Sequence, residues 1–96
     1  MGSMKARAQH DLEIADAELN KVYKQALATR SEKGAAALKE AQRAWIIYRD
    51  STCIAYGTGE EGGSLEGYMV VACSEALTKH RTEELKKLFL SDKYPY

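Results

Sequence analysis

Two cysteines, Cys53 and Cys73, carry the most distinctive chemistry in this chain of 96 residues. They lie 20 positions apart and lack the C-x-x-C spacing of redox-active thiols. An even number of cysteines in a short chain favours a disulfide, which would stabilise the fold by roughly 3 kcal/mol by closing a loop. Such a bond would indicate an oxidising compartment. Two free buried thiols and a metal site remain the alternatives.

A metal site would need the two histidines, His10 and His80, as further ligands. His80 follows Cys73 by seven residues, which corresponds to about 10 Å along a helix axis and is too far for both to bind one zinc ion. The serines lack the surroundings of a nucleophile elbow, and carboxylates such as Glu83 and Glu84 are adjacent rather than placed across a cleft. We therefore expect no catalytic residue, no metal and no cofactor, and a protein that is not an enzyme.

A glycine-rich segment, residues 57–63, contains four glycines and the acidic pair Glu60 and Glu61. Its spacing matches no phosphate-binding loop, and two carboxylates would repel phosphate. The segment is either a flexible connection between helices or an exposed acidic finger that meets a cationic protein. In the second interpretation Tyr56 and Tyr68, which flank the segment, are the candidate anchors of a partner-binding surface.

The composition argues against two classes of partner. Fourteen basic and 14 acidic side chains give a formal net charge of zero, whereas affinity for nucleic acid comes from neutralising phosphates with positive charge. The longest wholly apolar stretches are a few residues long, too short to span a membrane. Residues 1–3 resemble an expression remnant, so we expect that a signal peptide has been removed. We expect residues 4–91 to form a single helical domain and residues 92–96 to be a tail.

Three amphipathic segments must position the residues named above. In each, apolar residues recur at steps of three and four, which is typical of a helix with one buried face. The first segment, residues 4–29, carries the stripe Ala8, Leu12, Ala15, Leu19, Val22 and Ala26. The second, from about 35 to 56, carries Leu38, Ala41, Trp45, Tyr48, Thr52 and Ala55. The third, from about 65 to 90, carries Val70, Cys73, Leu77, Leu85 and Leu88.

The connections between these segments are short. Ser31 is the predicted N-cap of the second helix and Ser64 that of the third, while Gly34 and the glycines of residues 57–63 are the predicted breaks. Long helices joined by short connections lie antiparallel to their neighbours. The sequence therefore predicts an all-α fold, an antiparallel three-helix up-down-up bundle with one Cys53–Cys73 disulfide between the second and third helices.

The disulfide, if it forms, sets the register of the second and third helices. It brings Arg81 beside Trp45, where the guanidinium would stack on the indole ring. A matching hairpin between the first and second helices places Trp45 in the middle of the bundle and Asp16 within reach of Arg49. Asp16 or Asp50 would then supply the counter-charge of Arg49.

Three stretches of the chain resemble one known family. They are Ala15–Tyr23 (ADAELNKVY), Ala41–Cys53 (AQRAWIIYRDSTC), and the glycine-glycine-serine sequence of residues 62–64 followed by Cys73, LTKHR at 77–81 and the Glu-Leu pair at 84–85. Together they resemble the LprI-type lysozyme inhibitor N-terminal domain family of bacterial secreted, periplasmic or lipid-anchored proteins. The resemblance covers nearly the whole chain. Its motif residues, which we expect to be structural, are Trp45, Tyr48, Arg49, Asp50, Gly62, Gly63, Ser64 and Arg81.

The resemblance implies a helical, periplasmic or secreted domain that binds and inhibits a lysozyme or related muramidase. The acidic pair in the glycine-rich segment would speed its encounter with a basic hydrolase. The alternative is a non-inhibitory envelope interaction or structural module, either a homo-oligomer or an accessory or immunity protein of a secretion system. In that case Ile47 and Ile54 would form the interface. We expect a monomer or a weak homodimer.

Overall fold

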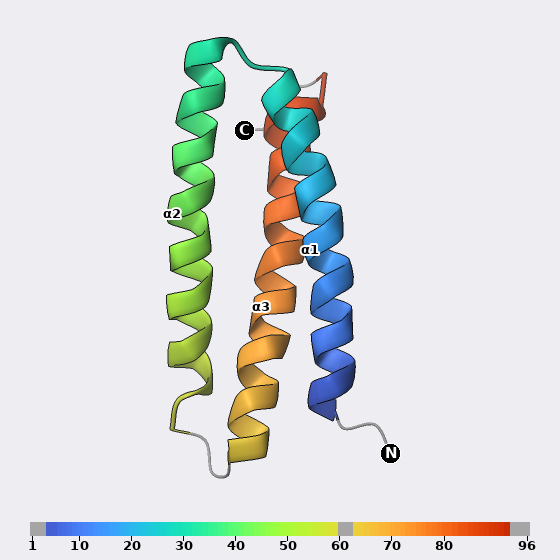
Figure 1. The fold of residues 1–96 in the computed structure, drawn as a ribbon, viewed down its shortest axis with the longest axis vertical. Coiled ribbons are helices and arrows are strands. Elements are labelled where there is room, and N and C mark those ends of the chain that lie inside the picture. Colours follow the sequence, from blue (N-terminus) through green and yellow to red (C-terminus); the bar gives the residue numbers. More distant parts are fainter. Residues whose placement is uncertain (1–3, 60–62, 93–96) are drawn as a thin grey trace.

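The computed structural model describes residues 4–59 and 63–92, the first two residues after the gap by their backbone alone. These ranges form helices α1 (Met4–Ala28), α2 (Glu32–Gly57) and α3 (Gly63–Leu85), followed by a π-helical turn, η1 (Lys86–Leu90). Helices α1 and α3 run in the same direction and α2 runs in the opposite one (Figure 1). The predicted all-α, up-down-up bundle is confirmed.

The turn between α1 and α2 is built by a side-chain cap. The backbone N–H of Gly34 donates to Ser31 Oγ at 3.1 Å, which confirms Ser31 as the N-cap. Helix α2 begins at Glu32, so Gly34 lies in its first turn and does not break the helix. Helix α3 begins at Gly63, so Ser64 lies within the helix and not at the predicted capping position.

The apolar core lies in the half of the bundle nearest the α1–α2 turn. All three long helices contribute its buried side chains, which are Leu19, Val22, Ala26, Leu38 and Leu85. The half-buried rings of Trp45 and Phe89 pack against this cluster, and Arg30 covers Phe89 with its guanidinium 5.4 Å from the ring centroid. The stripe predicted for the first helix is confirmed, because its members are buried except for the half-buried Leu12.

Helix α2 confirms only half of its predicted stripe, because Leu38 is buried and Trp45 and Thr52 are half-buried. Ala41, Tyr48 and Ala55 are exposed, whereas the buried residues are Leu38, Gln42, Cys53 and Gly57. Apolar character alone predicted that the two alanines and the tyrosine are buried rather than Gln42. The prediction was wrong because Gln42 accepts a hydrogen bond from α3, which allows a polar side chain to be buried in place of an apolar one.

Helix α3 also departs from its predicted stripe. Its buried positions are Ser74, Thr78, Thr82 and Leu85, whereas Val70, Cys73 and Leu77 are only half-buried. The two buried threonine hydroxyls have partners, since Thr82 donates to the Thr78 carbonyl at 3.0 Å and Thr78 Oγ1 accepts from Arg49. Small side chains suit this helix because it packs against both α1 and α2.

The bundle is elongated, 47 × 25 × 23 Å, and its helices are not packed equally. Helix α1 packs along α3, and α2 also packs mainly against α3, so α1 and α2 touch little (Figure 1). Among the described residues, no helix combines the length and the apolar character needed to cross a bilayer. The sparse packing between α1 and α2 leaves a groove on one face of the molecule.

Candidate functional site

The disulfide between Cys53 and Cys73 is present and joins α2 to α3. The two Cα atoms are 5.4 Å apart, and Cys53 is fully buried. Both cysteines of the chain are used, so the alternative of two free thiols is excluded. The bond lies in the half of the bundle opposite the apolar core, close to the end of α2.

Gly57, the last residue of α2, allows the closest approach of α2 to α3. A Cβ atom at this position would lie 2.6 Å from Val70 Cγ2 and 3.1 Å from the carbonyl oxygen of Glu66. No other side chain therefore fits without a shift of α3. Together with the disulfide, this contact fixes the end of α2 against the first turns of α3.

The predicted partner-binding residues lie at this end of the bundle, with one part outside the described residues. Tyr56 projects from the last turn of α2 and is 58% exposed, whereas Tyr68 in the second turn of α3 is half-buried. Glu60 and Glu61, like Gly62 of the motif, fall outside the described residues. The structure therefore places both tyrosines beside the connection and leaves the acidic pair as a prediction.

Arg49 joins the three long helices at the middle of the bundle. Its NH1 atom lies 3.3 Å from Asp16 Oδ1 of α1 and 3.3 Å from Thr78 Oγ1 of α3. Its Nε atom lies 3.0 Å from Asp50 Oδ1. The guanidinium carbon is 5.3 Å from the centroid of the Trp45 ring. Both predicted carboxylates thus pair with Arg49, and Thr78 is a third partner that the sequence did not reveal.

Arg81 of α3 contacts the same indole ring at 6.0 Å, as predicted. Its Nε atom donates to Gln42 Oε1 at 3.0 Å, and its NH1 atom pairs with Glu84 Oε1 at 2.6 Å. Gln42 was not predicted from the sequence as a residue of this cluster. The signal that identifies it is its spacing, because Gln42 lies four residues after Leu38 and seven before Arg49 on one face of α2.

The aromatic residues with helical spacing are less buried than is usual for such residues. Aromatic residues that recur with helical spacing are more often core than surface residues. In this chain they are Trp45, Tyr48, Tyr56 and Tyr68. Here Trp45 and Tyr68 are half-buried, while Tyr48 is 56% exposed and Tyr56 also faces solvent. The predicted place of Tyr48 in the buried stripe is therefore wrong, whereas Tyr56 is exposed, as contact with a partner would require.

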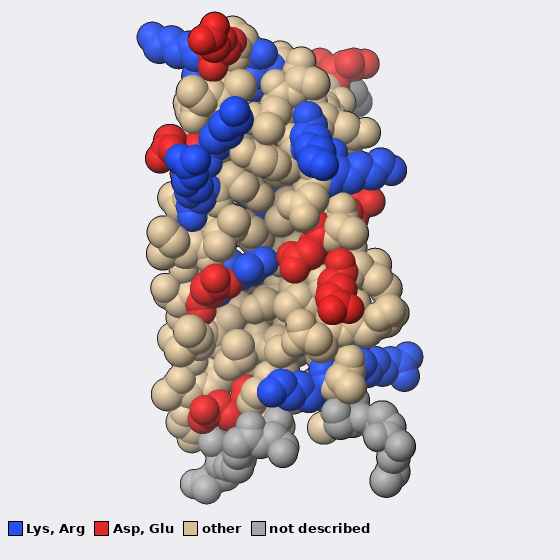
Figure 2. All heavy atoms as spheres, viewed as in Figure 1, with Lys and Arg blue, Asp and Glu red and all other residues tan. Residues whose placement is uncertain are grey.

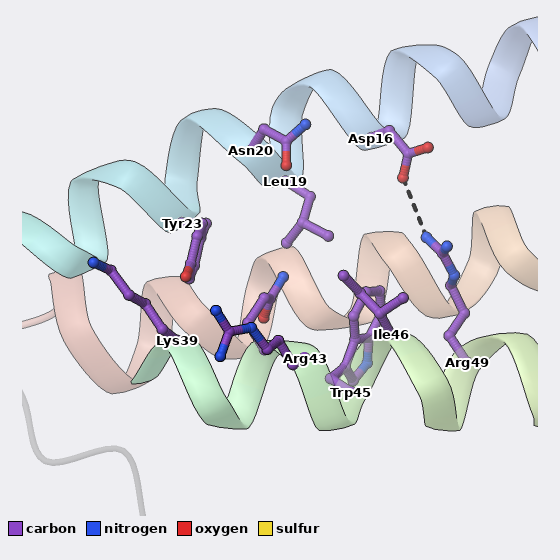
Figure 3. Close-up of a pocket in the computed structure, with 10 residues that line it drawn as sticks. Asp16, Leu19, Asn20, Tyr23, Lys39, Arg43, Trp45, Ile46 and Arg49 are labelled. Atoms are coloured by element: carbon purple, nitrogen blue, oxygen red, sulfur yellow. Dashed lines mark hydrogen bonds and ion pairs between the residues drawn. The ribbon is translucent and has the colours of Figure 1, made fainter. Parts of the chain in front are cut away.

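A groove of about 450 Å³ runs between α1 and α2 (Figure 3). Residues of α1 form one wall and residues of α2 the other; they are Asp16, Leu19, Asn20, Tyr23, Lys39, Gln42, Arg43, Trp45, Ile46 and Arg49. In Figure 3, Leu19 and Tyr23 point from α1 toward α2. Figure 2 shows basic side chains on both sides of the upper half of this face, over α1 and α2. This groove was not predicted from the sequence, because the apolar stripes led us to expect that α1 and α2 pack against each other.

The surface ion pairs do not form a reactive cluster. Lys79 Nζ lies 2.7 Å from Glu75 Oε2, and this hydrogen bond, together with the carboxylate charge, raises the pKa of Lys79. Both residues lie on one face of α3, four positions apart, and such exposed pairs contribute little to stability. Within residues 4–59 and 63–92, no group of three or more His, Cys, Asp or Glu side chains is placed to hold a metal ion.

The sequence matches known proteins over most of its length. A family profile described as "Lysozyme inhibitor LprI" matches residues 1–85, which confirms the resemblance drawn from the motifs. The chain is 44% identical over 97 aligned residues to "Uncharacterized protein R02472" of Rhizobium meliloti (strain 1021). That alignment covers 88% of this chain and 70% of the relative. No solved structure matches the chain.

Proposed function

The chain belongs to the LprI lysozyme inhibitor family, and on that premise we propose that it binds and inhibits a lysozyme-like cell-wall hydrolase outside the cytoplasm. The family match over residues 1–85 carries this proposal, since the described activity of the family is inhibition rather than catalysis. The Cys53–Cys73 disulfide supports the compartment, because such bonds persist in the oxidising periplasm or extracellular space.

The surface that we assign to the hydrolase is the end of the bundle where α2 passes into α3. Tyr56 offers an exposed aromatic ring there, on a helix that the disulfide and the close contact at Gly57 hold against α3. An aromatic side chain on a rigid support loses little entropy on binding and is a frequent centre of interface affinity. Glu60 and Glu61 follow Tyr56 by four and five residues in the sequence and would attract a basic enzyme.

Inhibition assays with charge-reversal variants test this surface. The protein is titrated into a lysozyme assay, alongside the Glu60→Lys/Glu61→Lys variant and the control Glu83→Lys/Asp92→Lys. Both variants change the net charge equally, but Glu83 and Asp92 lie toward the opposite end of the bundle. We expect the first variant to inhibit at least about tenfold more weakly, mainly through slower association, and the control to inhibit like the parent.

Full inhibition by the Glu60→Lys/Glu61→Lys variant would remove the acidic pair from the mechanism. Failure of the parent protein to bind or inhibit any of several muramidases would overturn the proposed function itself. The two results are distinguishable, because the first requires an active parent.

Tyr56 has a matched control on its own helix. Tyr56→Ala is expected to weaken inhibition about tenfold, the loss typical of an aromatic interface anchor. Tyr48→Ala removes a ring of similar exposure two turns away and is expected to leave inhibition within about twofold of the parent. Unfolding midpoints of both variants should match the parent, since both rings are largely solvated. Equal losses in the two variants would contradict the assignment of Tyr56.

A second candidate function rests on two exposed isoleucines. Ile47 and Ile54 lie two turns apart on α2 and both face solvent, as an interface between copies would require. Light scattering after size exclusion discriminates this envelope module from the inhibitor. A stable dimer that dissociates in the Ile47→Lys/Ile54→Lys variant, with no binding to any muramidase, would favour it.

A further inference from the structure

The groove between α1 and α2 plays no part in the proposed contact with a hydrolase, yet polar groups converge on it. Its volume of about 450 Å³ lies within the range of small-molecule sites. It opens on the face shown in Figure 2, on the side of the molecule where α1 and α2 stand apart. Its lining combines hydrogen-bond donors from both helices with apolar side chains.

Gln42 is the buried polar residue of this groove, with 6% of its surface exposed. Arg81 donates to its Oε1 atom, and because a guanidinium can only donate, this contact fixes the orientation of the amide. The Nε2 atom of Gln42 has no hydrogen-bond partner among the described residues. In that part of the chain no fully buried side-chain nitrogen or oxygen lacks a partner, so Nε2 keeps some solvent-accessible surface, and Gln42 lines the groove.

Further donors face the same space from both walls. Asn20 and Tyr23 come from α1, and Lys39 and Arg43 come from α2 on the other side (Figure 3). Asn20, Tyr23 and Lys39 make no hydrogen bond or ion pair with the residues that the structure describes. The groove therefore presents several free donors to a ligand, which must supply the acceptors.

The charge of the groove selects the kind of acceptor. Arg43 pairs with Glu40. Arg49 with its two aspartates carries about one net negative charge at the end of the groove away from Lys39 (Figure 3). Lys39 is left as the unpaired cation of the lining within the described residues, so the upper half of the groove carries about one net positive charge. One positive charge suits a carboxylate better than a phosphate dianion.

We propose that the α1–α2 groove binds a small acylated carboxylate. The carboxylate lies between Lys39 and Arg43, and the acyl oxygen accepts a hydrogen bond from Gln42 Nε2. The acyl methyl group and the carbon skeleton rest on Leu19 and Ile46, which line the groove. Both an N-acetylated sugar acid and the carboxyl end of a short peptide carry this chemistry, and binding of either requires no hydrolase.

Titration followed by ¹⁵N NMR tests the site and separates the two sources. The carboxylate probes are N-acetylmuramic acid and N-acetyl-alanyl-alanine. Their neutral counterparts are N-acetylglucosamine and the amide of the same peptide. We expect at least one carboxylate probe to shift the backbone amides of residues 16–23 and 39–49, and its neutral counterpart to bind at least about tenfold more weakly. The probe that binds more tightly identifies the source.

Variants of exposed residues test the assignment without disturbing Gln42. Lys39→Glu/Arg43→Glu is expected to lower the affinity at least about tenfold. The control Lys33→Glu/Lys87→Glu changes the net charge equally, but neither residue lines the groove, and its affinity should stay within about twofold of the parent. Asn20→Ala keeps the charge and removes one donor, so a loss of about threefold to tenfold is expected.

Several results would overturn the proposal. They are no shift of the groove amides by either carboxylate at about 20 mM, equal binding of the neutral counterparts, equal loss in the control variant, or tighter binding of inorganic phosphate in the same groove. Circular dichroism of each variant, compared with the parent, separates lost binding from lost helix. The outcome does not depend on lysozyme inhibition, which is measured separately.

Discussion

At the scale of single residues, Arg49 and Arg81 explain how a small bundle buries two positive charges. Both guanidiniums lie near the same indole, 5.3 and 6.0 Å from the Trp45 ring, and each is also bonded to a carboxylate and to an uncharged side chain. A planar guanidinium keeps most of its hydrogen bonds in such a setting, which offsets the cost of leaving water. Trp45 is thereby fixed at the centre of the three helices.

Gly57 permits the contact between α2 and α3, and its replacement tests that role. Gly57→Ala places a methyl group 2.6 Å from Val70 Cγ2, a branched side chain that has few other conformations in a helix. We expect the free energy of unfolding to fall by about 1–2 kcal/mol, because the cost of overpacking exceeds the gain in helix propensity. Urea unfolding followed by circular dichroism measures the change.

Gly67 is the matched control for this substitution. It lies inside α3, and a Cβ atom there would meet only the flexible end of Lys5, at 3.1 Å from Nζ. Gly67→Ala should therefore be neutral or stabilise the protein by up to about 1 kcal/mol. If both substitutions changed the stability in the same direction and by the same amount, the close contact at Gly57 would not be the cause.

At the scale of elements, the three long helices depend on different kinds of support. Helix α1 is held by a continuous stripe of small and branched apolar residues against α3. Helix α3 has neighbours on two sides and buries hydroxyl groups that find partners within the bundle. Helix α2 has one main neighbour, so its ends, its polar contacts and its disulfide must contribute more to its position.

Ser31 supports the beginning of α2, the end of this helix that is remote from the disulfide. Ser31→Ala removes the acceptor for the Gly34 N–H and is expected to lower the free energy of unfolding by about 1 kcal/mol. Ser31→Asn keeps a side-chain acceptor and should recover most of that stability. Thermal unfolding midpoints compare the two variants. An unchanged Ser31→Ala protein, or an equal loss in Ser31→Asn, would show that the cap contributes nothing.

At the scale of the whole molecule, stability is divided between the two ends of the bundle. The apolar cluster lies near the α1–α2 turn, while the disulfide joins α2 and α3 in the opposite half. A chain of 96 residues buries a limited apolar core, so a covalent bond stabilises the half of the bundle that lies away from this core. It also holds the end of the bundle that we assign to the hydrolase.

Removal of the disulfide tests this division. Cys53→Ala/Cys73→Ala opens a loop of 20 residues, which is expected to lower the free energy of unfolding by about 3 kcal/mol. Hydrogen exchange should rise most at the end of α2 and the start of α3, and least around Leu19 and Val22. Dithiothreitol should destabilise the parent and leave the variant unchanged. A uniform rise in exchange along all helices would contradict a local role for the bond.

The sequence by itself determined the elements and their order. Helical spacing predicted the end of α1 to within one residue, and the glycines predicted the end of α2. Ser31 was correctly predicted as the N-cap of α2, although the helix was expected from about residue 35 and begins at Glu32. The two cysteines set the register of α2 and α3, from which the approach of Arg81 to Trp45 followed. The approach of Asp16 to Arg49 followed from the predicted hairpin between α1 and α2. These features depend on local spacing or on one covalent constraint, and both can be read along the chain.

Only the tertiary structure decided which faces of α2 and α3 are buried and where the molecule is open. Apolar patterns rank Ala41 and Tyr48 above Gln42, because hydropathy does not register a partner supplied by another helix. For the same reason, apolar patterns do not indicate that α2 touches α1 so little that a groove remains between these two helices. Burial of a polar side chain is a property of a pair of groups, and such pairs exist only once the helices are assembled.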